Sequence, residues 1–167
     1  MLYHISEEAG IRRFDPRPHE SFAHHTVWAI DAEHLRNYLL PRDCPRVTFH
    51  RVQTSTADDV RQFLGDADAV VAFERRWLAR VRSCILYRYH LPPTNFVCVD
   101  PGAVYFVSTE SVMPSAVDTI TDALQAIADN GASTLVVDDL WPLHDAITKS
   151  SLQFSMIRMR NAQPPVS

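Results

Sequence analysis

The first side chain in this sequence that could do chemistry is His4, which stands in the short apolar segment Leu2–Ser6. A segment so close to the N-terminus forms little core by itself. Its histidine must therefore be buried against a partner or exposed in a cleft for use. In a cleft, an imidazole is suited to hydrogen bonding and proton exchange near neutral pH. His4 is the first candidate for a functional residue.

A second candidate is Glu110, which follows the apolar run 104–108 and precedes Pro114. A carboxylate just beyond the end of a central strand is well placed to enter a cleft, because loops on a rigid scaffold often carry binding residues. The alternative is an ordinary solvated loop glutamate. The sequence leaves both interpretations open.

A dense polar cluster, Arg42-Asp43-Cys44-Pro45-Arg46, supplies a third set of reactive groups. A cysteine between two arginines can have a lowered pKa and act as a nucleophile. A catalytic thiol also needs a base, and the sequence locates none for Cys44. We therefore favour a structural turn at Pro45, with Asp43 paired to an arginine.

Histidines are concentrated near the N-terminus, where five of the eight lie within the first 34 residues. Zinc sites usually use closely spaced ligand pairs such as HExxH or CxxC, and neither pattern occurs here. The adjacent His24 and His25 fall in a predicted loop, where their side chains tend to diverge. The sequence therefore predicts no metal site.

The composition is typical of a single globular domain with its own core. The chain has 167 residues, of which 46% are hydrophobic, and we expect one domain over residues 1–162 with a loose tail over 163–167. A net charge of −4 argues against general nucleic-acid binding. No apolar run approaches the roughly 18 residues that a membrane span requires. Three widely spaced cysteines without a CxxC pair favour a reducing cytoplasm.

Short runs rich in Val, Ile, Tyr and Phe predict strands. They cover residues 2–5, 27–30, 47–52, 69–72, 84–91, 96–99, 104–108, 134–137 and 154–160. Capping residues and apolar stripes predict five helices, over residues 31–40, 55–64, 73–81, 115–128 and 140–149.

The order of these elements is not a regular strand–helix alternation. The runs 84–91, 96–99 and 104–108 are joined by connections too short for helical crossovers, so we expect them to be antiparallel neighbours. We therefore predict an α+β domain with a mostly antiparallel sheet, continuous or split, flanked by about five helices.

Five segments spread along the chain resemble an uncharacterised bacterial protein family. They are residues 2–8, 27–31, 41–46, 140–143 and 154–162. The resemblance spans nearly the whole length and implies no particular activity.

The order of elements is also similar to that of the ADP-ribosyltransferase-like superfamily. Its members often begin with a strand carrying Tyr-His, matched here by Tyr3-His4. A second strand with an aromatic residue then leads into a helix, matched by Trp28, and a later strand supplies a glutamate, matched by Glu110. The resemblance implies an ADP-ribosyltransferase-like fold in which NAD is a substrate for ADP-ribosyl transfer or hydrolysis.

The same resemblance implies roles for particular residues. His4 would hold a ribose hydroxyl, Trp28 would stack on nicotinamide and Glu110 would bind the nicotinamide ribose. Positive charge develops on the sugar as the nicotinamide bond breaks, and a carboxylate stabilises such charge. The diphosphate would be clamped by an arginine, for which the candidates are Arg42, Arg46 and Arg158.

Two other functions compete with this one. The first is a non-catalytic module that binds a small ligand or a partner. Ile5 and Ile30 favour it, because the superfamily frequently has a small residue or a Ser or Thr at the matching positions. The second is a metal-dependent hydrolase that uses the N-terminal histidines. The decisive observation is whether His4, Trp28 and Glu110 meet around one hollow.

Overall fold

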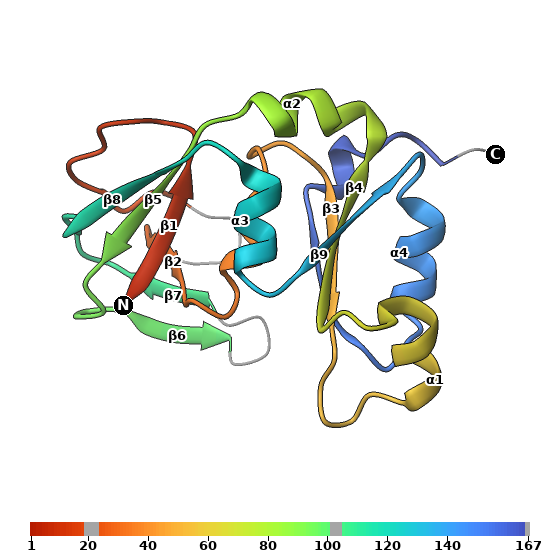
Figure 1. Cartoon of the computed structure of the whole chain (residues 1–167). Helices are drawn as coiled ribbons and strands as arrows, with labels where there is room; N and C mark the ends of the chain where they lie inside the picture. Colours follow the sequence, from red (N-terminus) through yellow and green to blue (C-terminus); the bar gives the residue numbers. More distant parts are fainter. Residues whose placement is uncertain (19–23, 101–104, 166–167) are drawn as a thin grey trace.

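The computed structural model describes residues 1–18, 24–100 and 105–165, and it contains two β-sheets (Figure 1). The larger sheet has six strands, each antiparallel to its neighbours. In spatial order they are β6 (Val97–Asp100), β7 (Tyr105–Ser108), β2 (Val27–Ile30), β1 (Leu2–Ser6), β5 (Leu86–Leu91) and β8 (Ala116–Ile120).

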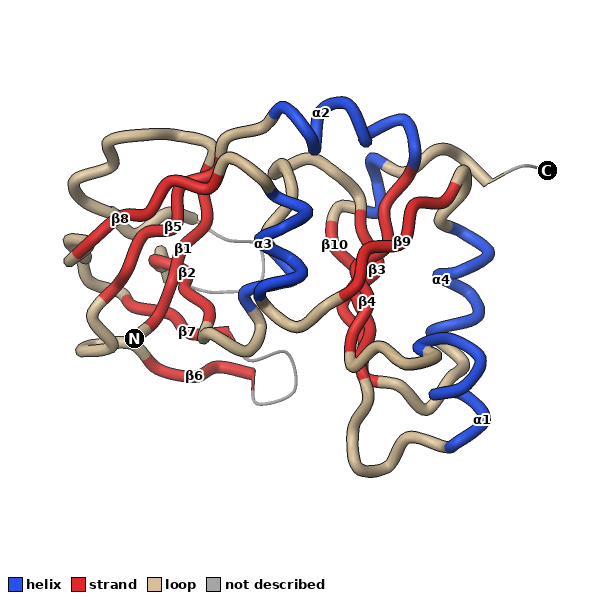
Figure 2. Tube along the Cα trace, in the orientation of Figure 1, coloured by secondary structure: helices blue, strands red, loops and turns tan. Residues whose placement is uncertain are grey.

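The smaller sheet has four strands and lies beside the first (Figure 2). In spatial order they are β10 (Gln153–Ile157), β3 (Arg46–His50), β4 (Ala69–Glu74) and β9 (Ser133–Val137). The β4–β9 pair is parallel, and the other pairs are antiparallel. All six residues of β4 are buried, because the strand is central and covered on both faces.

One helix separates the two sheets. Helix α3 (Ala123–Asp129) is capped at its N-terminus by Asp122, whose carboxylate accepts a hydrogen bond from the backbone N–H of Gln125 at 3.0 Å. Its buried Ile127 packs in one core with Leu86 of the larger sheet and Phe73 of the smaller one. Figure 1 shows α3 between the sheets and α2 (Leu78–Ser83) above it. The two sheets therefore share a core.

The outer faces of the sheets have cores of their own. Helices α1 (Ala57–Asp59) and α4 (Trp141–Ile147) lie on the outer side of the smaller sheet, where Ile147 packs against Phe49 (Figure 1). Helix α1 continues as a π-helix, Val60–Leu64. The other face of the larger sheet is covered by a segment that is fixed by an antiparallel bridge between Phe14 and Val112.

These observations confirm the predicted α+β class with mostly antiparallel strands in two separate sheets. The predicted strand over residues 27–30 has the observed bounds, and most others differ by one to three residues. One predicted strand begins at residue 104, which lies outside the described residues. The described part of the chain has four α-helices instead of about five. No helix within it has both the length and the apolar composition needed to span a bilayer.

The predicted helix over residues 115–128 is wrong in its first half. Residues 116–120 form β8, and only the second half is helical, as α3. The apolar spacing that suggested one helix is overridden by pairing with β5, in which Arg88 faces Asp118 and donates two hydrogen bonds to its carboxylate, at 2.7 and 2.9 Å. Such cross-strand charge pairs stabilise a sheet and are invisible to local patterns.

The predicted helix over residues 31–40 is reduced to a 3-10 turn, Leu35–Tyr38. Asp31 binds the backbone N–H of His34 at 2.9 Å and its ring nitrogen Nδ1 at 2.7 Å, which closes a tight local turn. The guanidinium of Arg46 then donates a hydrogen bond to the backbone carbonyl of Asn37. In a longer helix, this carbonyl would accept a hydrogen bond from the backbone of the next turn.

Three other expectations also differ from the structure. Strand β5 does not pair with β6, because it inserts between β1 and β8. The third predicted helix starts later than residue 73, since Phe73 is the fifth residue of β4. The last strand ends at Ile157 because Arg158 takes a left-handed backbone conformation, with φ at 56°.

The predicted loose tail is anchored at its first residue. Glu74, at the end of β4, is completely buried, and its carboxylate accepts the backbone N–H of Gln163 at 2.7 Å and Nε of Arg76 at 2.6 Å. Trp141 donates its indole N–H to the carbonyl of Gln163 at 2.7 Å.

Candidate functional site

His4 lies on β1, near the middle of the larger sheet, and its ring is oriented by the backbone of β2. Nδ1 lies 3.1 Å from the carbonyl oxygen of Trp28. Because a carbonyl oxygen only accepts hydrogen bonds, Nδ1 must carry the proton. Burial lowers the pKa of His4, so the ring is neutral at pH 7 and Nε2 keeps its lone pair. Within the described residues, no group hydrogen-bonds to Nε2.

The surroundings of His4 combine an aromatic ring with positive charge. The ring of Phe14 lies with its centroid 4.8 Å from that of the imidazole. The charges of Arg42 and Arg17 are close enough to lower the pKa of His4 further, although less than burial does. In the part of the chain that the structure describes, neither guanidinium has a hydrogen bond or an ion pair. Nε2 of His4, which can accept a hydrogen bond, thus lies near the guanidinium groups of Arg42 and Arg17, which are unpaired within the described residues.

Such a set of groups has a definite chemical preference. Nε2 accepts a hydrogen bond from a hydroxyl or amine of a ligand. Arginine side chains bind phosphate and carboxylate groups, often through two parallel hydrogen bonds. The arrangement therefore suits a ligand that carries both a hydroxyl group and an anionic group.

Trp28 and His4 are neighbours through the backbone of Trp28, and their side chains point apart. His4 shares its sheet face with Leu2 and Tyr89, which is the face covered by Phe14. The indole of Trp28 lies on the opposite face, where its ring packs edge-on against Tyr105 with centroids 5.2 Å apart. The structure does not bring the imidazole and the indole to one hollow.

Glu110 is exposed, and its carboxylate accepts a hydrogen bond from the side-chain amide of Asn95 at 2.6 Å. Its backbone N–H is bound by the hydroxyl of Ser108 at 3.1 Å. Two residues later the chain reaches Val112, which pairs with Phe14. The segment that carries Glu110 therefore runs on the same side of the sheet as His4, while its carboxylate is engaged by a neighbouring turn.

The other two predicted arginines differ from Arg42, which is exposed. Arg46 is fully buried, and its guanidinium donates to the backbone carbonyls of Pro41 at 2.6 Å and Cys44 at 2.7 Å. This contradicts the expectation that Arg46 binds a ligand, because its donors are used by the fold and no surface is left. Arg158 is half-buried and follows the last strand, β10.

The polar cluster contains a turn, but it lies earlier than predicted: it runs from Pro41 to Cys44, so Pro45 follows the turn and does not set it. The backbone N–H of Cys44 donates to the carbonyl of Pro41 at 3.0 Å. Burial raises the pKa of the Cys44 thiol to about 12, which rules it out as a nucleophile near neutral pH. Within the described residues Asp43 forms no ion pair with an arginine; its backbone carbonyl accepts a hydrogen bond from the side-chain amide of Asn161 at 2.8 Å.

Three residues around His4 are missing from the sequence-based set: Glu7, Phe14 and Arg17. Arg17 stands between Pro16 and Pro18, a pattern that favours an extended and rigid segment and could have drawn attention to it. Phe14 and Glu7 carry no comparable local signal, because their roles depend on contacts with distant parts of the chain.

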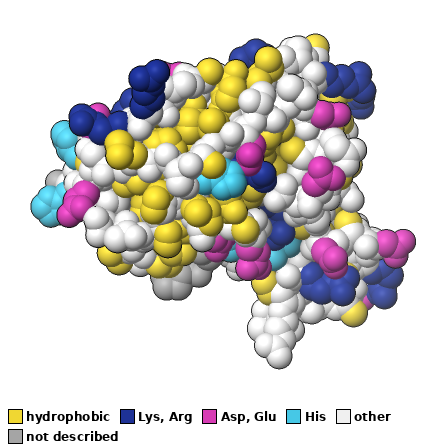
Figure 3. All heavy atoms as spheres, turned by 60° about the vertical axis from the view of Figure 1, so that its left-hand side comes forward, with side chains coloured by type: hydrophobic (Ala, Val, Ile, Leu, Met, Phe, Trp, Pro, Cys, Tyr) yellow, Lys and Arg dark blue, Asp and Glu magenta, His cyan; other side chains and the backbone are white. Residues whose placement is uncertain are grey.

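A second polar group lies on the opposite face of the larger sheet, where the carboxylate of Asp118 binds Arg88 and, at 2.6 Å, Nε2 of His90. Arg88 also lies over the ring of Tyr3, 5.7 Å from its centroid. Figure 3 shows a side of the molecule on which a broad hydrophobic area is interrupted by basic, acidic and histidine side chains. The members of the Asp118 group satisfy one another across three neighbouring strands, which is the usual role of such pairs in a sheet.

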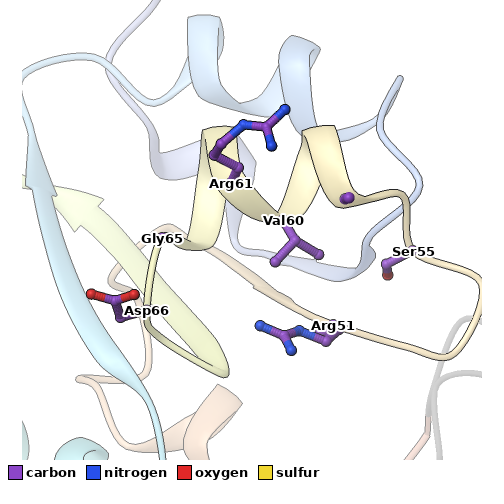
Figure 4. A pocket seen from close by; sticks show the side chains of 7 residues that line it. Arg51, Ser55, Val60, Arg61, Gly65 and Asp66 are labelled. Atoms are coloured by element: carbon purple, nitrogen blue, oxygen red, sulfur yellow. The ribbon is translucent and has the colours of Figure 1, made fainter.

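An open hollow of about 440 Å³ lies under the π-helix of the smaller sheet. In Figure 4, Val60 and Arg61 lie on one helix, and Arg51 lies below that helix. Arg61 is paired with Asp58. The two guanidiniums do not converge, so the hollow offers a weaker anion site than the surroundings of His4.

Metal ligands do not gather in the described residues, where no three His, Cys, Asp or Glu side chains are placed to hold an ion. Of the N-terminal histidines, His19 lies outside the described part. His34 is committed to Asp31, and its ring centroid is 6.4 Å from that of His50.

The chain belongs to a family of unknown function, DUF6886, whose model matches residues 3–162. This agrees with the full-length resemblance seen in the sequence. No curated protein and no solved structure matches the chain. The comparisons therefore give no support to an ADP-ribosyltransferase-like relationship.

Proposed function

We propose that the protein binds a small phosphorylated ligand of the nucleotide type. In this proposal His4 accepts a hydrogen bond from a ligand hydroxyl, while Arg42 and Arg17 bind its phosphate. One observation carries the proposal: a neutral imidazole is fixed by its Nδ1–H, with Nε2 unpaired among the described residues and two unpaired guanidiniums nearby. A half-buried acceptor beside two cations is best satisfied by a hydroxyl and an anion on one molecule.

ADP-ribosyl transfer or NAD hydrolysis would be a catalytic form of the same function. That chemistry requires an aromatic ring and a carboxylate at one ribose. The indole of Trp28 lies on the other face of the sheet, and the carboxylate of Glu110 is bound by Asn95. For this reason we favour a binding module without bond cleavage as the role of the site.

The experiment is thermal melting of the wild-type protein with ADP-ribose, NAD, ADP, adenosine and inorganic pyrophosphate. A ligand present at one hundred times its dissociation constant stabilises the folded state by about 2.7 kcal/mol. We expect ADP or ADP-ribose to raise the melting temperature. Adenosine and pyrophosphate should raise it less, because each carries only half of the required groups.

Matched variants locate the site. His4→Ala and Arg42→Ala should reduce the ligand-induced shift, whereas Glu8→Ala should not, because its exposed side chain has no hydrogen-bond partner in the described part of the chain. No shift with any phosphorylated ligand would refute the proposal. Release of nicotinamide from NAD over hours would replace binding with catalysis as the function.

A further inference from the structure

Glu7, the residue after β1, connects the strand of His4 to the loop of Arg42. Its Oε2 accepts the backbone N–H of Arg42 at 3.0 Å. Its Oε1 forms an ion pair with Arg80 of α2. The two carboxylate oxygens of Glu7 thus contact two different parts of the chain. The part contacted by Oε2 is the loop that carries Arg42, a residue of the proposed ligand site.

The charge of Glu7 is offset without use of the Arg42 side chain. Arg80 supplies the cation that pairs with the carboxylate, and Arg42 contributes only its backbone N–H. In the residues that the structure describes, the guanidinium of Arg42 has no partner. The guanidinium is therefore available to bind a ligand, even though the carboxylate of Glu7 contacts the backbone of the same residue.

The conformation of the Arg42 loop and its position relative to His4 depend on different contacts. Inside the loop, the buried Arg46 binds the carbonyls of Pro41 and Cys44, and this fixes the turn. The contact between Glu7 and Arg42 is instead a link from the loop to β1, which also carries His4 three residues earlier. Loss of Glu7 should leave the turn intact but allow the Arg42 loop to move relative to β1 and His4.

We propose that Glu7 is a positioning residue that holds the Arg42 guanidinium at the correct distance from Nε2 of His4. This inference rests on the proposed function of the same site. Its consequence is selectivity for ligands whose hydroxyl and phosphate groups have the spacing found in a nucleotide. Positioning by a neighbouring hydrogen bond is a general means of lowering the entropic cost of binding.

The test is a double-mutant cycle with ADP as the probe. Dissociation constants are measured for the wild type, Glu7→Ala, Arg42→Ala and the double variant. We expect each single variant to bind ADP about ten- to a hundredfold more weakly, as for loss of one charge-assisted contact. If Glu7 acts through Arg42, the double variant should bind no more weakly than Arg42→Ala alone.

Two further variants separate positioning from general stability. Glu7→Gln keeps a carbonyl oxygen for the Arg42 N–H and should restore most of the affinity, and it replaces Glu7→Ala if that variant fails to fold. Arg80→Ala removes only the ion pair and should weaken ADP binding less than Glu7→Ala does.

The outcomes keep this inference distinct from the proposed function. Wild-type protein that does not bind ADP would overturn both. Wild-type binding that is unchanged in Glu7→Ala, or losses that simply add in the double variant, would overturn the role of Glu7 and leave the proposed function in place.

Discussion

Replacement of the buried Arg46 by methionine should destabilise the protein strongly. The guanidinium lies fully inside and donates to two carbonyls at short distance, those of Pro41 and Cys44, at 2.6 and 2.7 Å. Burial lowers the pKa of Arg46 to about 10, so it stays charged at neutral pH. Methionine fills similar space and carries no donor, so the carbonyl of Cys44 is left unsatisfied in the interior and that of Pro41 keeps only the N–H of Cys44.

The magnitude follows from these bonds. Two hydrogen bonds from a charged group are worth about 3–6 kcal/mol together, at about 1.5–3 kcal/mol each. Part of this is recovered because the variant no longer buries a charge, which costs several kcal/mol in an isolated site. We expect a net loss of about 2–4 kcal/mol in the free energy of unfolding, and a melting temperature lower by roughly 5–15 °C for a chain of this size.

The assay is urea unfolding followed by tryptophan fluorescence, with calorimetry for the melting temperature. Arg61→Met is the matched control, because Arg61 is 75% exposed and its ion pair among the described residues is with Asp58 on the surface. The control should change stability by less than about 0.5 kcal/mol. An Arg46→Met variant within about 1 kcal/mol of wild type would refute the reasoning, since the carbonyl of Cys44 would then have found another donor.

Two further predictions concern thiols and pH. Of the three cysteines, we expect only the exposed Cys98 to react with a thiol reagent in the native protein. The buried Cys44 and Cys84, whose pKa values are raised by burial, should react on unfolding, and fast labelling of either would contradict their burial. The pKa values of His4 and His50 are lowered by burial, so the unfolded state binds more protons as the pH falls below about 6.5, and stability should drop in that range. Melting curves at pH 7.5 and 5.5 measure this drop, which His4→Gln should reduce; an unchanged drop would show that His4 does not contribute.

The sequence was most informative for strands whose residues favour a pleated surface. The strand over residues 27–30 was predicted with its exact bounds, because Val, Trp and Ile favour a pleated surface. The stretch 116–120 was misassigned, because its apolar spacing fits a helix and its actual state depends on pairing with β5, a distant strand. Register between distant strands is a tertiary property that a single sequence does not display.

The same limit applies to the candidate site. The position of His4 in an apolar strand left two alternatives, burial against a partner or exposure in a cleft, and the structure shows the ring held by the carbonyl of Trp28. Whether His4 and Trp28 share a face depends on which residues of β1 and β2 lie opposite each other. That register is set by Tyr3 facing Ile30, which no local pattern reveals.

The route of the chain between the two sheets limits how the molecule can be divided. After β1 and β2 the chain crosses to β3 and β4, returns to add β5 through β8, and crosses again to add β9 and β10 (Figures 1 and 2). A single cut anywhere along this route separates strands that must pair. Neither sheet can therefore be excised as an autonomous fragment, and proteolytic nicking at one internal site should release no stably folded half. Assembly must also wait for contacts between residues far apart in the sequence, which is characteristic of slow-folding topologies.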